Sequence, residues 1–257
     1  MSTTMGKRGV IWKTPDITAD GLKMFACVTM LIQSIGVIIV NNGMIHLGSY
    51  TQESLNQALA EDSHLMMLAG IGSVMQLAGG LAVPVFAFLL VEGFLKTSSY
   101  QKYLLSILLF AVISEVPYDF AVGQKLVDWT GQNALISMAV SLMMLYFLRM
   151  MERYSGVKGA VLKVLIVFSA VVWVSLLRAQ YGLCVVLLAA VFYLFYTRNV
   201  LKTVLGAAIS LLYVTGPISF YLIWCYDETR KDRLPKYAYY VFYPLHLLVL
   251  GVIASQM

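Results

Sequence analysis

Charged residues are scarce in this chain: Lys, Arg, Asp and Glu together make up 12% of its 257 residues. A soluble globular domain carries about 25% charged residues. The composition is instead 60% hydrophobic, with a mean hydropathy of +0.80. The shortage of charge excludes an ordinary soluble domain and predicts a polytopic membrane protein.

Cysteine and long basic stretches are also nearly absent. The three cysteines, Cys27, Cys184 and Cys225, all fall within apolar runs, and none belongs to a CxxC pair. We therefore expect neither a disulfide framework nor a metal site. The net charge of +5 is spread over short loops, which excludes nucleic acid as a partner and instead reflects orientation in a lipid membrane.

The first 20 residues are polar and lack the apolar core and cleavage site of a signal peptide. The first apolar run is therefore expected to act as its own uncleaved signal. No short repeat or low-complexity segment divides the rest of the chain. We expect a polar N-terminal segment over residues 1–21 and one multi-span membrane domain over residues 22–257.

Apolar runs of roughly 17–25 residues, the length that crosses a bilayer, recur along the chain. They predict an all-α polytopic transmembrane helix bundle of about eight spans. Apolar sequence at 65–72 is expected to form a separate interfacial or half-membrane helix. The predicted spans are 22–40, 73–95, 103–122, 133–150, 160–177, 181–196, 203–225 and 237–255.

Lys and Arg in short loops predict the orientation. The N-terminal segment is basic and is expected in the cytoplasm, whereas loop 42–64 has no Lys or Arg and is expected outside. With eight spans, the basic loop 227–236 would lie on the outer side of the membrane, although Lys and Arg are expected in cytoplasmic loops. Either one helix is re-entrant or miscounted, or the acidic residues of that loop offset its positive charge.

Two glutamates, Glu92 and Glu115, lie inside apolar predicted spans. A carboxylate in hydrocarbon costs roughly 2.5–3.5 kcal/mol, so such a residue faces protein or water and is a site candidate. At 1.5 Å per residue, Glu92 lies about 6 Å and Glu115 about 20 Å from the cytoplasmic edge. Gln33, Ser34 and His246 lie near the depth of Glu115. We predict that these four deeper residues surround one buried polar centre.

Other polar residues are placed by helical spacing. Asp119 is four residues from Glu115 and shares its helix face. Lys23 is eleven residues before Ser34 and lies on the same stripe, which suits a long anionic cofactor that enters from the cytoplasm. An interfacial anchor is the alternative for Lys23, a helix cap is the alternative for Asn133, and a hydrogen-bonded core histidine is the alternative to a catalytic base for His246.

Four blocks of sequence carry a family resemblance: LKMFACVTMLIQSIG (22–36), GGLAVPVFAFLLVEGF (79–94), KYLLSILLFAVISEVPYDFA (102–121) and YYVFYPLHLLVL (239–250). Fainter likeness covers QNALISM (132–138) and AQYG (179–182). These blocks resemble the TraX family of polytopic inner-membrane proteins and, distantly, multi-span membrane acyltransferases. The resemblance implies transfer of an acetyl group from cytosolic acetyl-CoA to an amine, such as the N-terminal amine of a pilin.

The resemblance and the predicted polar centre together give the candidate site residues. We expect the catalytic residues to be Glu115, His246, Ser34, Gln33 and Asp119, and the acetyl-CoA-binding residues to be Lys23, Glu92, Asn133 and Tyr243. All of them except Gln33 and Ser34 match the family pattern.

The chain departs from the family pattern at four charged or titratable positions. The family usually reads Asp-His at 33–34, Gly-Arg at 79–80 and Asp-Tyr-Gly at 180–182, where this chain has Gln33-Ser34, Gly79-Gly80 and Gln180. With serine at 34, we expect His246 or Glu115 to act as the general base. The neutral replacements leave open a non-catalytic relative that binds a peptide, lipid or protein in the same cavity. A small transporter is a third possibility.

Overall fold

The computed structural model describes residues 17–227 and 236–257. This part of the chain is helical, with two isolated single-residue bridges as its extended pairings. The α-helices are α1 (Ala19–Ser34), α2 (Gln52–Glu61), α3 (Ser63–Gly80), α4 (Ala82–Lys96), α5 (Tyr100–Gly123), α6 (Ala134–Met150), α7 (Gly156–Leu176), α8 (Gly182–Leu194), α9 (Asn199–Ser210), α10 (Ser219–Trp224) and α11 (Lys236–Ala254). A π-helix, η1 (Ile35–Met44), continues α1, and four 3₁₀ turns are η2 (Leu47–Ser49), η3 (Met151–Arg153), η4 (Leu211–Tyr213) and η5 (Gly216–Ile218).

The prediction of an all-α membrane bundle is confirmed. Within the described ranges, six helical stretches are long and apolar enough to cross a bilayer: Ala19–Met44, Ser63–Lys96, Tyr100–Gly123, Ala134–Arg153, Gly156–Leu176 and Tyr237–Ala254. Two shorter apolar helices cover Gly182–Leu194 and Asn199–Tyr213. Together they give eight apolar segments, in agreement with the expected number.

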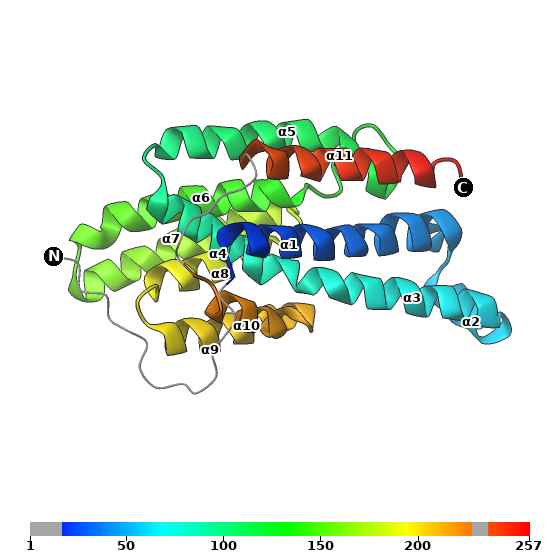
Figure 1. The fold of residues 1–257 in the computed structure, drawn as a ribbon, viewed down its shortest axis with the longest axis horizontal. Helices are drawn as coiled ribbons and strands as arrows, with labels where there is room; N and C mark the ends of the chain where they lie inside the picture. Colours follow the sequence, from blue (N-terminus) through cyan, green and yellow to red (C-terminus); the bar gives the residue numbers. More distant parts are fainter. Residues whose placement is uncertain (1–16, 228–235) are drawn as a thin grey trace.

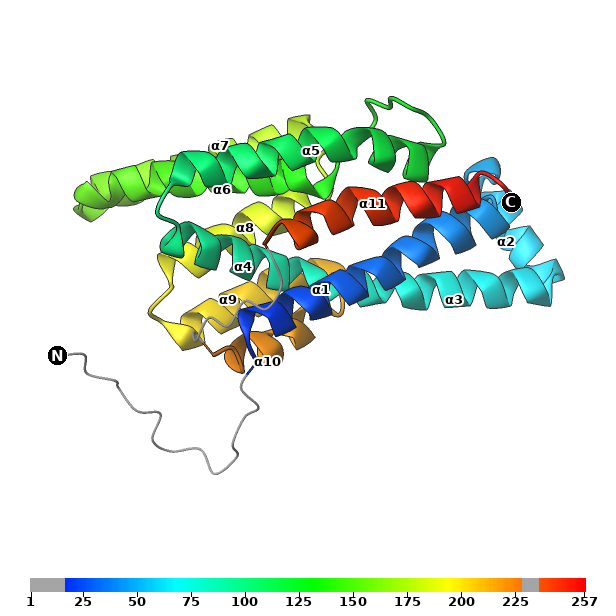
Figure 2. The same ribbon diagram turned by 45° about the horizontal axis from the view of Figure 1, so that its top comes forward.

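The long helices run roughly along the longest axis of the molecule (Figure 1). Helices α5 and α11 lie side by side, and α1 lies between α11 and α3 (Figure 2). The main core is formed by α4, α6 and α8, whose Phe94, Leu142 and Leu188 are almost fully buried. The side chains of α7 are mostly exposed, as expected of a helix that faces lipid.

Helices α3 and α4 are nearly continuous, so the apolar sequence at 65–72 is part of one long stretch, and the expectation of a separate helix there was wrong. The break at Leu81 follows Gly79 and Gly80. A Cβ atom on Gly80 would lie 2.5 Å from Thr215 Oγ1 and 2.7 Å from the Tyr213 carbonyl oxygen. Only glycine leaves room there, because the turn after α9 packs directly against this helix.

Residues 203–225 do not form the single span that their hydropathy predicted. The segment folds into α9 and α10, separated by a bend around Val214–Gly216. The two helices run back along each other, since Trp224 Nε1 donates to Thr203 Oγ1 at 2.7 Å. This is the re-entrant arrangement that was one of the alternatives for the C-terminal topology.

The end of α10 meets the residue that precedes α1. Ile17 N donates to the Cys225 carbonyl at 2.9 Å, and Asp227 N donates to the Ile17 carbonyl at 2.9 Å. Asp227, where the basic loop 227–236 begins, therefore lies beside the residue that precedes α1, which agrees with placement of that loop on the same side of the membrane as the N-terminal segment. Residues 1–16 and 228–235, which carry the basic residues of that argument, lie outside the described ranges, so the cytoplasmic orientation stays a prediction.

Candidate functional site

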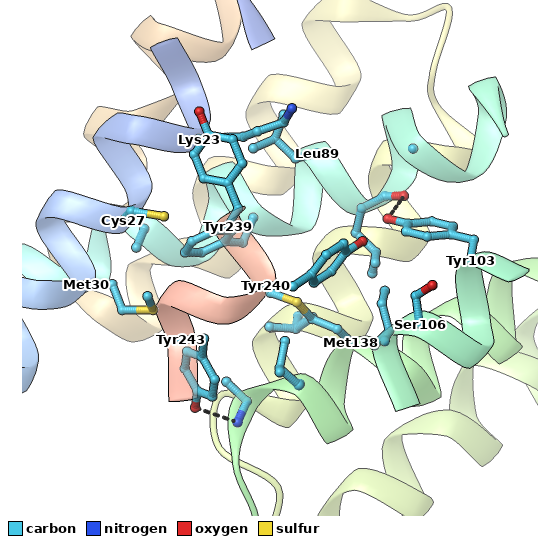
Figure 3. Close-up of a pocket in the computed structure, with 18 of the residues that line it drawn as sticks. Lys23, Cys27, Met30, Leu89, Tyr103, Ser106, Met138, Tyr239, Tyr240 and Tyr243 are labelled. Atoms are coloured by element: carbon cyan, nitrogen blue, oxygen red, sulfur yellow. Dashed lines mark hydrogen bonds between the residues drawn. The ribbon is translucent and has the colours of Figure 1, made fainter. Parts of the chain in front are cut away.

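A cavity of about 490 Å³ lies among α1, α4, α5 and α11, with α6 and the start of α8 at its inner end. We call it the large cavity. Figure 3 shows Lys23, Cys27 and Met30 of α1 facing Tyr239, Tyr240 and Tyr243 of α11 across this space, with Tyr103 and Ser106 of α5 on a further side. Its lining is mostly apolar or aromatic, as is usual for sites that bind small molecules.

Three lysines line one end of the large cavity, which we call its mouth: Lys23, Lys96 and Lys102. Lys23 Nζ pairs with Asp20 at 3.2 Å, and Lys96 Nζ pairs with Glu92 at 2.5 Å. Lys102 has no ion-pair partner among the described residues. The mouth is therefore positively charged, although two of its three charges are compensated.

Gln33, Tyr181 and Tyr243 lie at the inner end, where they line both the large cavity and a second cavity of about 60 Å³, the small cavity. Gln33 Nε2 donates to the Tyr181 hydroxyl oxygen. Ten residues separate Lys23 from Gln33 along α1, which corresponds to about 15 Å. The hydrogen-bonded Gln33 and Tyr181 side chains thus form a polar partition at the end of a channel.

Ser34 lines the small cavity and contacts His246, with 3.2 Å between Ser34 Oγ and His246 Nε2. His246 Nδ1 is 2.9 Å from the Phe242 carbonyl oxygen, which can only accept. The neutral imidazole therefore carries its hydrogen on Nδ1, and its Nε2 accepts from the Ser34 hydroxyl. Ser34 is also the last residue before the π-helix η1, and π-helical segments recur at functional sites.

Glu115 is held by Asn133 rather than by the Ser34–His246 pair. Both the side-chain amide and the backbone amide of Asn133 donate to Glu115 Oε2, the latter at 3.4 Å. The other carboxyl oxygen, Oε1, is buried and accepts no hydrogen bond from the described residues. This geometry ties α5 to the start of α6.

Asn133 is the N-cap of α6. Its Oδ1 accepts from Leu135 N at 2.9 Å, and its Nδ2 donates to the Ala111 carbonyl at 2.8 Å. The side chain is fully buried and lines neither cavity. This position supports the helix-cap alternative and not the implied contact with acetyl-CoA.

Glu92 and Asp119 also point away from both cavities. The buried Glu92 carboxylate accepts from the Tyr196 hydroxyl at 2.8 Å, in addition to its ion pair with Lys96. Asp119 Oδ2 accepts from Asp128 N at 2.8 Å and anchors the loop between α5 and α6. Their observed contacts are structural, so the implied cofactor-binding and catalytic roles find no support in the geometry.

Tyr181 is the residue that sequence reasoning missed. It lies in the tight turn between α7 and α8, where Gln180 N donates to the Gln132 carbonyl at 2.9 Å and Ser137 Oγ donates to the Gln180 carbonyl at 2.6 Å. Gly182 permits the turn because a Cβ there would lie 2.7 Å from Val174 Cβ. The faint family match at AQYG was the one signal in the sequence that pointed to it.

We expect Gly79→Ala to disturb the partition. A Cβ at position 79 would lie 1.9 Å from Gln33 Oε1 and 2.2 Å from its Cδ, so Gln33 must move away from Tyr181. The matched control is Gly70→Ala on the same helix, where nothing lies within 4 Å and better helix propensity should raise stability by roughly 0.5–1 kcal/mol. Thermal unfolding in detergent should show a lower Tm for Gly79→Ala and an equal or higher Tm for Gly70→Ala. Equal Tm values for both variants would contradict the packing described.

The fold and its cavities define a multi-pass membrane protein with an interior polar site reached from one end of the helix bundle. The chain belongs to the TraX family, because it matches the family described as TraX protein over residues 18–254. It is 26% identical over 227 residues to the "Probable fimbrial assembly protein FimC, serogroup H1" of Dichelobacter nodosus, with 75% of this chain and 89% of that protein covered. No solved structure matches the chain.

Proposed function

We propose that this protein transfers an acetyl group from acetyl-CoA to an amine. One observation carries the proposal: a lysine-lined cavity ends at a polar partition, and Ser34, which lines the small cavity beside that partition, is hydrogen-bonded to the buried His246 behind it, which itself lines neither cavity. The first part suits a long anionic acyl donor, and the second suits proton removal from an attacking amine. Membership of the TraX family supports the same reading.

The residues of the large cavity fit acetyl-CoA in character. The ammonium groups at the mouth can pair with the phosphates of acetyl-CoA. Apolar side chains, among them Phe86 and Met138, line the walls of the cavity and suit the narrow pantetheine arm. The start of α5, with Ser98 and Ser99, lines the same mouth and adds the positive end of a helix dipole. The thioester supplies an activated acyl group, which belongs at the inner end beside Gln33.

His246 acts as the general base in this proposal. Its Nε2 takes a proton from the amine, directly or through the Ser34 hydroxyl, as the amine nitrogen forms a bond to the acyl carbon. The carbon–sulfur bond breaks, and the proton passes to the departing thiolate. The Nδ1–H bond to Phe242 holds the ring in the orientation that this requires. Glu115 is not assigned this role, because Asn133 holds its carboxylate.

We propose that the acceptor is the N-terminal amine of a membrane-held peptide, such as a pilin subunit, in the bacterial inner membrane. The family and the fimbrial assembly protein from Dichelobacter nodosus support an acceptor of this class. The small cavity is bounded by the apolar side chains of Val37, Ile38 and Val122, which suits a short, uncharged peptide end.

The test is incubation of the purified protein with radiolabelled acetyl-CoA and a peptide that has a free N-terminal amine. We expect label on that amine and none on the same peptide with a blocked N-terminus. Absence of transfer to any amine would overturn the proposed function.

A non-catalytic binding protein is the second candidate. The observation in its favour is that the 213–215 turn occupies the space beside Gly80, so the arginine that the family usually has at position 80 would have no room here. This candidate predicts no acetyl-CoA binding by calorimetry, and activity only after Asp and His are restored at positions 33 and 34. Micromolar binding of acetyl-CoA by the unaltered protein would exclude it.

Lys102→Ala is expected to raise the KM for acetyl-CoA about fivefold and to leave kcat unchanged, because a loss of roughly 1 kcal/mol of phosphate attraction affects binding alone. The matched control is Lys125→Ala, since Lys125 lies in the loop beyond α5 and lines neither cavity. Initial rates over a range of acetyl-CoA concentrations measure both constants. An unchanged KM for Lys102→Ala would place the donor elsewhere.

A further inference from the structure

The hydroxyl group of Tyr181 has an unused hydrogen. Its oxygen accepts from Gln33 Nε2, and the hydroxyl donates to none of the described residues. Tyr181 lines both cavities, so this hydrogen lies where the end of the large cavity meets the small one. The Tyr181 side chain is half-buried, so this donor is available to a molecule that occupies the cavities.

Tyr103 and Tyr240 of the large cavity differ from Tyr181, whereas the Tyr243 hydroxyl likewise accepts one hydrogen bond and donates to none of the described residues. The Tyr103 hydroxyl donates to the Leu90 carbonyl at 3.4 Å. The Tyr243 hydroxyl faces the start of α6, where it accepts from Ala134 N at 3.4 Å. Tyr240 stacks on Phe110 with 5.2 Å between ring centroids. It lines the large cavity but not the small one. Tyr181 is thus the tyrosine whose hydroxyl is held at the partition by a side-chain amide donor.

The backbone of Tyr181 is held in a conformation that tyrosine rarely adopts. Its φ of +58° and ψ of +9° lie in the left-handed region, and Arg178 in the same turn has φ +49°. Each such residue costs on the order of 1–2 kcal/mol. The hydrogen bonds from Gln180 N and Ser137 Oγ maintain the turn. The contact of the ring with Tyr213, at 5.1 Å and 73°, fixes its plane.

We infer that Tyr181 is a catalytic residue whose hydroxyl donates a hydrogen bond to the acyl oxygen as the amine attacks. The inference rests on the proposed function. Negative charge builds on that oxygen while the carbon–nitrogen bond forms, and it returns to the carbonyl as the carbon–sulfur bond breaks. The hydroxyl keeps its proton throughout, because it stabilises charge and transfers nothing. The donor on the Tyr181 oxygen, Gln33 Nε2, polarises the phenol and strengthens its O–H as a donor.

Strain at the partition agrees with this role. A preorganised donor aimed at the place where charge develops stabilises a transition state without rearrangement, and removal of one such donor costs about 10²–10³ in kcat. The inference also gives Gln33 a role at a position where the family usually has an acid. Its amide holds and polarises the phenol, a task that needs no charge.

Tyr181→Phe tests the inference, because it removes one oxygen and keeps the ring. We expect kcat to fall about 10²-fold while the KM for acetyl-CoA stays within about threefold. Tyr146→Phe is the matched control and should leave both constants within about twofold, since Tyr146 lines neither cavity and no hydrogen bond of its hydroxyl is present among the described residues. Thermal unfolding should give equal Tm values for the three proteins.

A second set of variants distinguishes loss of the hydroxyl from misfolding of the Tyr181→Phe protein. Fluorotyrosines placed at position 181 keep the hydroxyl but make it a stronger donor, so kcat should rise with the fluorine content at a pH where the phenol keeps its proton. A structural role would leave kcat insensitive to the fluorine content. Transfer by wild type together with undiminished kcat for Tyr181→Phe would overturn the inference and leave the proposed function standing. Absence of transfer by wild type would overturn both.

Discussion

Replacement of His246 by alanine is expected to lower the rate of acetyl transfer by about 10²–10⁴-fold, the contribution of a positioned general base. The reason is the orientation of the ring: Nδ1–H is donated to Phe242, so Nε2 is left as an acceptor 3.2 Å from Ser34 Oγ. The imidazole lines neither cavity and contacts the small one through Ser34, so binding of acetyl-CoA should change by less than about threefold. Initial rates and calorimetry on the same preparation separate the two effects.

His46→Ala is the matched control for this substitution. His46 is exposed beyond the π-helix, where its Nδ1 contacts the Asn42 carbonyl at 3.0 Å, and it lines neither cavity. Its removal should leave the transfer rate unchanged. Ser34→Ala should fall between the two variants, because an amine can reach Nε2 without the hydroxyl relay. Equal rates for His246→Ala and wild type would remove histidine from the mechanism.

Asn133→Ala should have the largest effect on stability, with a loss of about 3 kcal/mol in the free energy of unfolding. The substitution removes the N-cap of α6, the bond from Nδ2 to the Ala111 carbonyl, and the side-chain donor to Glu115. One oxygen of Glu115 is already without a partner among the described residues. Loss of the amide would leave the carboxylate with the weak backbone contact alone. Unfolding by a denaturing detergent measures the change.

Thr51→Ala is a suitable comparison, because Thr51 caps α2 in an exposed capping box and supports no buried group. Its loss should cost about 1 kcal/mol or less. A similar small effect for Asn133→Ala would contradict the description of Asn133 and Glu115 as the junction of α5 and α6.

The helices and the depth of the polar residues follow from the sequence alone. Hydropathy identifies long apolar helices because burial in lipid demands a continuous run. The rise per residue places Ser34 and His246 at a common depth, and the structure brings them into contact. Lys23 lies at the mouth of the large cavity and Gln33 at its inner end, in the order that helical spacing gives.

Rotational position and irregular backbone could not be predicted in this way. The depth of a residue in the membrane does not show which way its side chain points around the helix axis. Glu92 contacts Tyr196, which is distant in sequence, and Asp119 contacts Asp128, which lies in an irregular loop. A hydropathy window cannot separate one long helix from two short ones that fold back, so the segment 203–225 was read as a span. Tyr181 was missed because its left-handed backbone depends on contacts with Gln132 and Ser137.

The most direct test of the account is transfer of radiolabelled acetyl from acetyl-CoA to a peptide amine by the purified protein, run beside His246→Ala. The account predicts label on the free N-terminal amine with wild type and a loss of about 10²-fold or more with the variant. No label above the level of the His246→Ala protein, in a wild-type preparation shown to be folded by its thermal transition, would contradict it.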